Sequence, residues 1–245
     1  MKGFLGKGIL SLAAWDADKS LLAYRDTGNC TSLVPSFATQ EVNIPNMRDA
    51  SGGNDEGLER IQDVTLAVVL TSLLKDNELI AHRAEATVIT TSLAVTEEAH
   101  KATPGRRVRT NFLIDTSATV TVTDGTDPYV AGTDYVVAPT GLIIPEGSTI
   151  AANSDIEISY TRIAQYVLEA LVNSGSYYSA MLEGYNEYSG EYEMWEWYKV
   201  RFGPYQNFNL IANEHSPLTM SAKVYRDETV TGVGKSQYYR VWRPN

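Results

Sequence analysis

Two stretches of this chain alternate apolar and polar residues with a period of two, a pattern typical of β-strands with one dry and one wetter face. In the first stretch, Ser36–Pro45, one face carries Phe37, Thr39, Glu41 and Asn43, and the other carries Ala38, Gln40, Val42 and Ile44. In the second, Ile61–Thr71, one face carries Val64, Leu66, Val68 and Leu70, and the other carries Asp63, Thr65 and Ala67. The alternation predicts two long antiparallel strands.

The segment between these strands, Asn46–Arg60, is polar and rich in glycine, which predicts a loop. A two-residue turn is enough to join antiparallel strands, so a loop of this length needs a reason. A small domain gains little from a ribbon that projects beyond its own core. A subunit that completes its sheet with neighbouring subunits gains much more, so the hairpin indicates assembly.

The remaining elements follow from periodicity and turn residues. Leu73–Ala86 has an apolar stripe that predicts an amphipathic helix, and Gln165–Asn173 is compatible with a second, short one. Further strands are predicted at Gly8–Ala14, Leu21–Asp26, Val88–Glu97, Tyr177–Tyr188, Glu191–Phe202, Ser216–Arg226 and Gln237–Arg243.

Residues 102–162 read as short strands cut by Asp-Gly, Asp-Pro, Ala-Gly and Pro-Glu-Gly turns, a signature of antiparallel β structure. The predicted fold is therefore mainly β. An antiparallel β-sandwich or barrel, with a long β-hairpin and one flanking α-helix, is expected from residues 1–101 and 163–245. Residues 102–162 are expected to form an inserted small β module.

Charge and composition remove several function classes. The 245 residues carry a net charge of −10, so the chain lacks the Lys/Arg surface that supplies most nucleic-acid affinity. The single cysteine, Cys30, allows neither an intramolecular disulfide nor a cysteine-based zinc site. No stretch approaches the roughly 18 apolar residues of a membrane span, and the N-terminal run Ile9–Trp15 lacks a signal-peptide pattern. A soluble chain made in a cytoplasm is expected.

Candidate chemistry is sparse, and we expect no catalytic residues, no metal and no cofactor. Carboxylates gather at Glu183, Glu187, Glu191, Glu193 and Glu196 among aromatic residues, but an acidic face of a hairpin explains them better than a glycosidase pair. The three histidines, His82, His100 and His215, show no ligand spacing. The aspartates Asp124, Asp127 and Asp134 fit turns better than a calcium site.

The order of these elements resembles the tail tube proteins, or major tail proteins, of long-tailed, siphophage-like bacteriophages. Three stretches carry the resemblance: Gly6–Asn29, the TDYVV–TGLIIPEGSTI–DIEISYT text at 133–161, and the closing hairpins at 182–204 and 216–229. The resemblance implies hexameric rings that stack into a hollow tube for passage of double-stranded DNA during ejection. It also implies a tape measure protein and tail terminator or tip proteins as partners, and a place in the virion tail after assembly in the host cytoplasm.

The alternation then assigns faces within such a tube. Thr39, Glu41, Asn43, Asp63 and Thr65 are expected to face the lumen, whereas Val42, Ile44, Val64, Leu66, Val68 and Leu70 are expected to face the subunit core. The loop between the strands is expected to be an inter-ring stacking element with Arg48, Asp49, Gly52, Gly53, Asp55, Glu56 and Arg60.

Other functions stay open at this point. The aromatic segment 177–202 could serve a virion-associated or cell-surface carbohydrate-binding or adhesin-like β protein. An acidic-site hydrolase would use the carboxylates of the same segment. A type VI secretion tube protein is a near relative of the tail tube hypothesis.

Overall fold

The computed structural model describes residues 5–19, 22–48 and 53–245. The protein is mainly β, with 52% of its residues in strands and 4% in helix, and its sheets are antiparallel. The described strands do not close into a barrel. Two compact units are formed, Met1–Glu85 with Leu168–Asn245 and Ala86–Val167, here called the first and second units.

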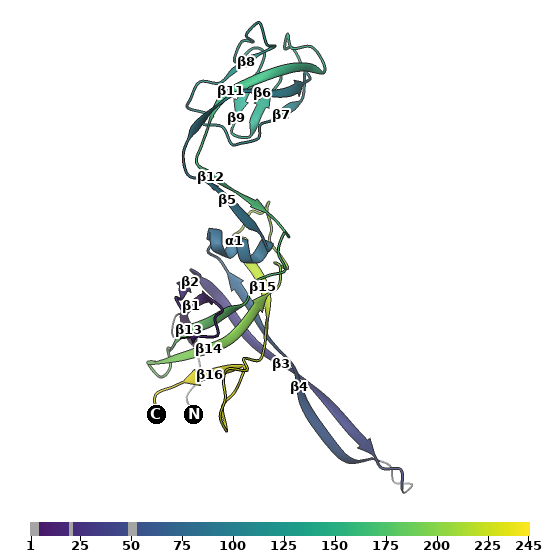
Figure 1. The fold of residues 1–245 in the computed structure, drawn as a ribbon, viewed down its shortest axis with the longest axis vertical. Coiled ribbons are helices and arrows are strands. Elements are labelled where there is room, and N and C mark those ends of the chain that lie inside the picture. Colours follow the sequence, from purple (N-terminus) through teal and green to yellow (C-terminus); the bar gives the residue numbers. More distant parts are fainter. Residues whose placement is uncertain (1–4, 20–21, 49–52) are drawn as a thin grey trace. The chain divides into compact units, whose positions relative to one another are not determined.

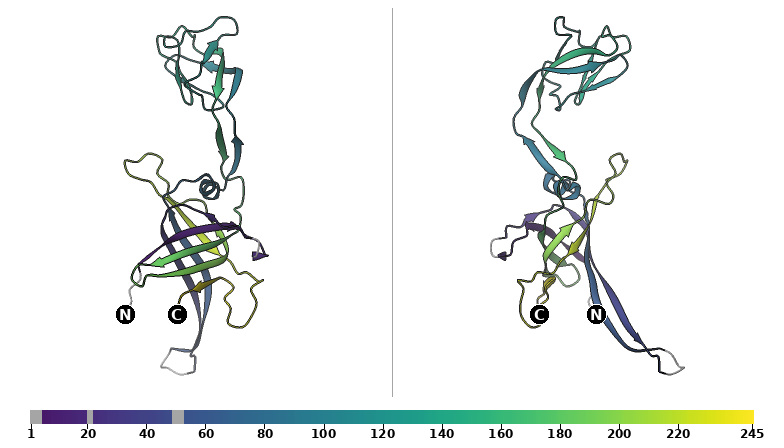
Figure 2. Two further views of the ribbon diagram at one scale, coloured as in Figure 1. Left: turned by 90° about the vertical axis from the view of Figure 1, so that its left-hand side faces the viewer. Right: turned by 45° about the vertical axis from the view of Figure 1, so that its right-hand side comes forward.

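The first unit is built on one eight-stranded sheet with the order β2-β1-β13-β14-β15-β4-β3, and β16 also pairs with β14 (Figure 1). Its strands are β1 (Gly6–Ala14), β2 (Arg25–Asp26), β3 (Cys30–Pro45), β4 (Asn54–Leu70), β13 (Tyr178–Asn186), β14 (Glu191–Phe202), β15 (Leu218–Val224) and β16 (Tyr239–Trp242). Figure 2 shows β1 and β13 crossing over β3 and β4, so the sheet folds back on itself as a sandwich.

The core of the first unit lies between the two halves of this folded sheet. Alternate residues of β4 and β15 supply one wall, including Leu66, Val68 and Met220, each 1% exposed. Trp197 of β14, also 1% exposed, and Leu10 of β1 supply the other wall. The predicted strands at 177–188 and 191–202, joined at Ser189-Gly190, are confirmed by the β13–β14 pairing.

The predicted helix is confirmed but is shorter than expected. Helix α1 spans Lys75–His82, and its chain direction changes at Arg83, whose φ of 49° is left-handed. Asn77, a polar residue in the apolar stripe, is fully buried. It donates to the carbonyl oxygens of Thr27 and Ser72, and its own amide oxygen accepts a hydrogen bond from Arg25. These bonds remove the cost of burying an amide.

Three sequence expectations differ from the structure. The segment Gln165–Asn173 is not helical, because β12 (Gln165–Glu169) pairs with β5 (Glu85–Ile89) where the chain passes between the two units. Residues 54–60, expected in a loop, belong to β4. Residues 86–101 and 163–167 belong to the second unit rather than to the first, since β6 (Leu93–Ala102) pairs with β11 (Ser154–Arg162) along most of its length.

The second unit is a small sandwich of two three-stranded sheets, β7-β10-β9 and β6-β11-β8. Its short strands are β7 (Arg107–Arg109), β8 (Thr121–Thr123), β9 (Val136–Ala138) and β10 (Gly141–Ile143). Its core is made by its own residues, among them Val122, Ile144 and Ile158, all 0% exposed. Turn-forming aspartates hold its loops: Asp124 accepts the backbone N–H groups of Thr126 and Asp127.

Candidate assembly interface

The hairpin of β3 and β4 runs far beyond the sheet that forms its base (Figures 1 and 2). The two strands have 16 and 17 residues and pair from Cys30 and Leu70 at the base to Pro45 and Asn54 near the tip. Every side chain from Ser36 to Pro45 is exposed, as are the side chains described from Asn54 to Gln62. The backbone ladder pairs the inner edges of the two strands, whereas the outer edge of β3 and the side chains of the distal half are left uncovered by the unit.

A β-bulge divides the hairpin into a basal and a distal half. Ala38 pairs with Asp63, but the next residue, Thr39, pairs with Ile61, so Gln62 is the extra residue in β4. Bulges of this kind bend a ribbon and increase its twist. In the basal half, Phe37 is paired with the buried Val64, and this face continues into the core.

Beyond the bulge the polarity of the two faces is reversed. The face that continues the core face carries Thr39, Glu41 and Asn43, with Glu59 and Gly57 opposite the last two. A Cβ atom on Gly57 would lie 2.7 Å from Oδ1 of Asn43 and 3.3 Å from Oε1 of Glu41, so these side chains lie across the glycine. This face of the distal half is polar and acidic.

The other distal face has an apolar middle, next to the paired Gln40 and Arg60 on one side and Glu56, opposite Ile44, on the other. Val42 is paired with Leu58, and Ile44 lies two residues further along on the same side. These three side chains are 48%, 51% and 56% exposed. We call Val42, Ile44 and Leu58 the distal apolar face. The expectation that Val42 and Ile44 face the subunit core is wrong, because both lie on the side of β3 that carries Ala38, opposite the face on which Phe37 pairs with Val64.

The five residues predicted to face a lumen are divided between two faces. Thr39, Glu41 and Asn43 share the distal acidic face. Asp63 and Thr65 pair with Ala38 and Ser36 on the opposite side of the ribbon. There Nζ of Lys223 lies 3.2 Å from Oδ1 of Asp63. The sequence alternation missed this division because it does not fix the register between the strands: Ser36 and Ala38, not Thr39 and Glu41, lie opposite Thr65 and Asp63.

The core-facing expectation holds for the basal part of β4. Val64, Leu66, Val68 and Leu70 are 4% exposed or less, and all four belong to the core of the first unit. Position along β4 therefore decides burial: its core-facing residues on the basal side of the bulge pack inside the subunit, and residues on the distal side do not.

The predicted stacking loop is much shorter than the sequence suggested. Glu56 and Arg60 are exposed strand residues of β4. Arg48 and Gly53 lie in the connection, where Asn46 donates its backbone N–H to the Gly53 carbonyl oxygen at 2.9 Å. Asp49 and Gly52 lie outside the described residues, and the side chain of Asp55 is likewise not described.

Over residues 3–242, the chain matches the family model described as Protein of unknown function UCP028589. The chain belongs to this family. No curated protein matches it. Because the family description states no activity, what this UCP028589 member does has to be inferred from its own residues.

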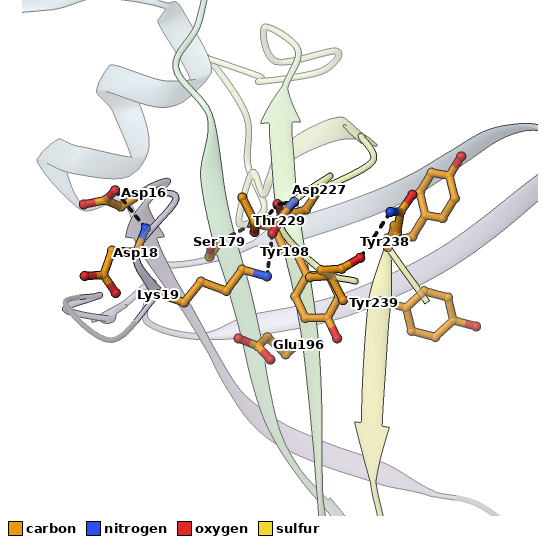
Figure 3. Close-up of polar contacts among 12 residues, drawn as sticks. Asp16, Asp18, Lys19, Ser179, Glu196, Tyr198, Asp227, Thr229, Tyr238 and Tyr239 are labelled. Atoms are coloured by element: carbon orange, nitrogen blue, oxygen red, sulfur yellow. Dashed lines mark hydrogen bonds and ion pairs between the residues drawn. The ribbon is translucent and has the colours of Figure 1, made fainter. Parts of the chain in front are cut away.

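A buried ion pair fixes the chain segments around β14 of this family member. Nζ of Lys19 lies 2.5 Å from a carboxylate oxygen of Asp227 and 3.6 Å from the centre of the Tyr198 ring (Figure 3). The other Asp227 oxygen accepts the backbone N–H and the hydroxyl of Thr229. Burial alone would raise the pKa of Asp227, but the bonds from Lys19 and Thr229 and the Lys19 charge outweigh it and lower the pKa.

The aromatic segment of β14 is mainly structural. Trp197 is buried, and Trp195 stacks on it with ring centres 5.9 Å apart. Glu193, whose side chain is 8% exposed, accepts hydrogen bonds from Nε1 of Trp195 at 2.9 Å and from Nε of Arg243 at 2.7 Å. This carboxylate is thus held as an acceptor in the fold, which does not suit a catalytic acid.

Sequence reasoning missed one polar cluster in the second unit. The Glu98 carboxylate accepts the Tyr160 hydroxyl at 2.7 Å and the Asn111 backbone N–H at 2.8 Å, and it lies 2.5 Å from Nε2 of His100. Burial and the neighbouring Glu98 raise the pKa of Tyr160 to about 12. The bulge in β6 that brings these groups together cannot be predicted from the sequence pattern. The polar groups of the cluster bond to one another, so it serves as a structural network.

No group of three His, Cys, Asp or Glu residues that could hold a metal ion occurs in the described part of the chain. The His82 ring, for example, lies edge-on to the Tyr205 ring, with ring centres 4.9 Å apart. Over the same described residues, α1 is too short and too polar to cross a membrane.

Proposed function

We propose that this chain is a non-enzymatic structural subunit of a phage tail tube, in which six copies form a ring and rings stack into a hollow tube. The observation that carries the proposal is the two-faced distal half of the β3–β4 hairpin. One face is apolar and the other acidic, and neither is covered by the subunit that makes it.

The distal apolar face supplies a reason to assemble. Val42, Ile44 and Leu58 are about half exposed, and covering each of them by a neighbouring subunit contributes about 1 kcal/mol. Phe37, 52% exposed, and Ile61, 59% exposed and paired with Thr39, lie on the opposite face, so apolar surface is left uncovered on both sides of the ribbon. A projecting ribbon whose apolar side chains find no partner in their own subunit fits a surface for a second copy.

The acidic face suits the inside of a tube. Thr39, Glu41, Asn43 and Glu59 can stay hydrated while the opposite face of the ribbon packs on a neighbour. A wall with carboxylates and no facing cations does not bind phosphates, so duplex DNA would pass without being held. Side-by-side ribbons would also satisfy the backbone groups of the outer edge of β3, the terminal strand of its sheet.

The proposal places the protein in the virion tail after assembly in the host cytoplasm. Its partners are then five further copies in each ring, the rings above and below, a tape measure protein inside, and terminator and tip proteins at the ends. Heterologous stacking of identical rings extends without closing, which is the symmetry that a tube requires.

Electron microscopy of the purified chain tests this proposal. Negatively stained protein, concentrated stepwise, is expected to show six-fold rings and then tubes, and sedimentation is expected to show masses in multiples of six chains. A chain that remains monomeric at every concentration and in the presence of crowding agents contradicts the proposal.

A carbohydrate-binding β protein is the second candidate, favoured by one surface feature. A shallow cavity of about 280 Å³ is lined by Tyr192, Trp242, Glu183, Glu193 and Arg243, among others. Tyr192 is 64% exposed and Trp242 36%, so both rings can be reached by a sugar. Saturable binding to an immobilised glycan that is lost in Trp242→Ala would favour this candidate over the tube.

A further inference from the structure

A second cavity in the first unit lies beside the C-terminal end of α1. It has a volume of about 180 Å³ and is lined by Leu79, Ile80, Arg83, Ala84, Asn173, Gly175, Ser176, Tyr178 and Phe202. The lining comes from α1 and its end, from the segment before β13 and from the end of β14. None of these residues belongs to the projecting hairpin, so the cavity is separate from the proposed assembly face.

The charged group of this cavity has no partner. Nε of Arg83 is buried and makes no hydrogen bond, and its guanidinium makes no ion pair with any described residue. A buried N–H without an acceptor is costly, and more so on a charged group. An acceptor from outside the described chain would remove this cost.

The backbone passes close to the guanidinium of Arg83 at Gly175, beside the cavity. Gly175 has a φ of +85°, which disfavours any side chain there, and a Cβ atom at this position would lie 3.4 Å from Nε of Arg83. Asn173 holds the neighbouring turn: its amide oxygen accepts the Gly175 N–H, and its amide nitrogen donates to the Ala84 carbonyl oxygen. The Asn173 amide is thus already engaged, and Arg83 remains as the unpaired donor.

The lining indicates which acceptor fits. A guanidinium binds carboxylates and phosphates through paired N–H groups. Apolar walls from Leu79, Ile80 and Phe202 favour a ligand that has an aliphatic stem as well as an anionic head. A carboxylate on a short methylene chain meets both conditions, whereas inorganic phosphate would leave the apolar walls without a partner.

We propose that the Arg83 cavity is a binding site for an aliphatic carboxylate, with Arg83 as the group that recognises the anion. The carboxylate has two sources, a free short-chain organic acid or a Glu or Asp side chain of another copy of this acidic chain. The site stands on the geometry around Arg83 and does not depend on the tube proposal.

Calorimetric titration of the full chain with glutarate, and separately with phosphate, tests the site. We expect saturable 1:1 binding of glutarate that is at least tenfold weaker in Arg83→Gln, which removes the guanidinium and its charge but keeps a polar side chain. Ser176→Leu, which fills the cavity and keeps the cation, is expected to weaken binding similarly. Arg107→Gln is the matched control, since Arg107 is an exposed arginine of the second unit that does not line the Arg83 cavity, and binding should not change.

Sedimentation distinguishes the two sources. If a side chain of another copy occupies the cavity, saturating glutarate and the Arg83→Gln change should both reduce self-association; if the ligand is a free acid, self-association should not change. Equal affinity for phosphate overturns the assignment to carboxylates. Absence of glutarate binding by the wild-type chain, together with unchanged self-association of a normally folded Arg83→Gln variant, shows that water alone fills the cavity.

Discussion

At the scale of single residues, the Lys19–Asp227 pair has a direct consequence for stability. Asp227 is 1% exposed, and its two oxygens are engaged by Lys19 and Thr229 (Figure 3). The pair connects the segment between β1 and β2 to the segment between β15 and β16, which are far apart in the sequence. Removing one partner leaves the other charge buried, and this costs more than the pair itself contributes.

We therefore expect Asp227→Ala to lower the free energy of unfolding by about 3 kcal/mol at pH 7. Asp63→Asn is the matched control, because the Asp63–Lys223 pair is on the surface, with side chains 44% and 56% exposed. Exposed pairs contribute about 0.5 kcal/mol or less. Urea unfolding of both variants measures the difference. Equal losses in the free energy of unfolding would show that the Lys19–Asp227 pair contributes no more than an exposed ion pair.

The same pair predicts a pH dependence. The pKa of Asp227 is lower in the folded chain than its ordinary value, so the folded state favours the ionised form. Its contribution is complete above about pH 4 and is lost as the pH falls through the lowered folded pKa. Between about pH 5 and about pH 3, the free energy of unfolding should fall more for wild type than for Asp227→Asn, because the asparagine cannot be protonated in this range. Parallel curves for the two proteins would contradict the assignment.

At the scale of elements, the hairpin carries the functional argument. Its basal half belongs to the core of the subunit, and its distal half has an apolar face on the opposite side. Because Val42, Ile44 and Leu58 contact little in their own unit, their replacement should affect assembly without affecting folding.

We expect the triple variant Val42→Ser, Ile44→Ser, Leu58→Ser to unfold at the same urea concentration as wild type but to form no rings or tubes. Thr39→Ala with Asn43→Ala, on the acidic face, is the control and should assemble. The two proteins are compared by sedimentation and negative-stain microscopy at matched concentrations. Normal tubes from the triple variant would exclude the distal apolar face as an interface.

The elements also show what the sequence could and could not predict. Alternation located the β4 residues Val64 to Leu70 in the core and placed β13 and β14 correctly, because these strands have one dry and one wet face. It failed at residues 54–60, where exposed strand pairing leaves no hydrophobic period and the glycines suggested a loop. It failed at Gln165–Glu169 because a strand pair with little burial resembles a short polar helix in sequence.

The candidate sites were predictable to a smaller extent. Glu41 and Thr39 were placed on one face correctly, but Asp63 and Thr65 were joined to them because a period-two pattern does not give the register between two strands, which pairs Asp63 with Ala38. The Arg83 cavity was not foreseen at all. Its lining is brought together from three distant segments, and only the fold places Gly175 beside the guanidinium.

At the scale of the whole molecule, the two units have separate cores. The buried residues of the second unit, from Ala102 to Tyr160, pack among themselves without any residue of the first. A unit that completes its own core can fold without its neighbour.

We expect the isolated segment 86–167 to fold. It should give a dispersed amide NMR spectrum and one cooperative thermal transition, since its sandwich and the Glu98–Tyr160 network are intact. In the isolated segment, Tyr160→Phe should lower the free energy of unfolding by about 1 kcal/mol or more, because Glu98 loses a hydrogen bond from a neutral donor. A disordered segment would show that the first unit is needed to fold the second.

Bore charge is a property of the assembled molecule. If the distal acidic face lines a lumen, Glu41→Lys with Glu59→Lys should leave tubes intact, because the face is hydrated, and should slow DNA ejection by introducing phosphate-binding cations. Ejection is measured as dye-detected release from purified virions, with Glu41→Gln and Glu59→Gln as a control for charge loss. Undiminished ejection from virions with normal tails would show that bore charge has no role.

The reversal of polarity at the Gln62 bulge also governs how a pool of free subunits behaves. The ribbon would need a half turn to bring Val42, Ile44 and Leu58 onto its own core, and the ladder of paired backbone groups opposes such a turn. A newly made chain therefore cannot bury the distal apolar face against itself. No conformational change is needed to expose this face before the chain meets another copy. If the chain polymerises as proposed, concentration and nucleation set the timing of growth, and a starter complex that lowers the nucleation barrier decides where growth begins.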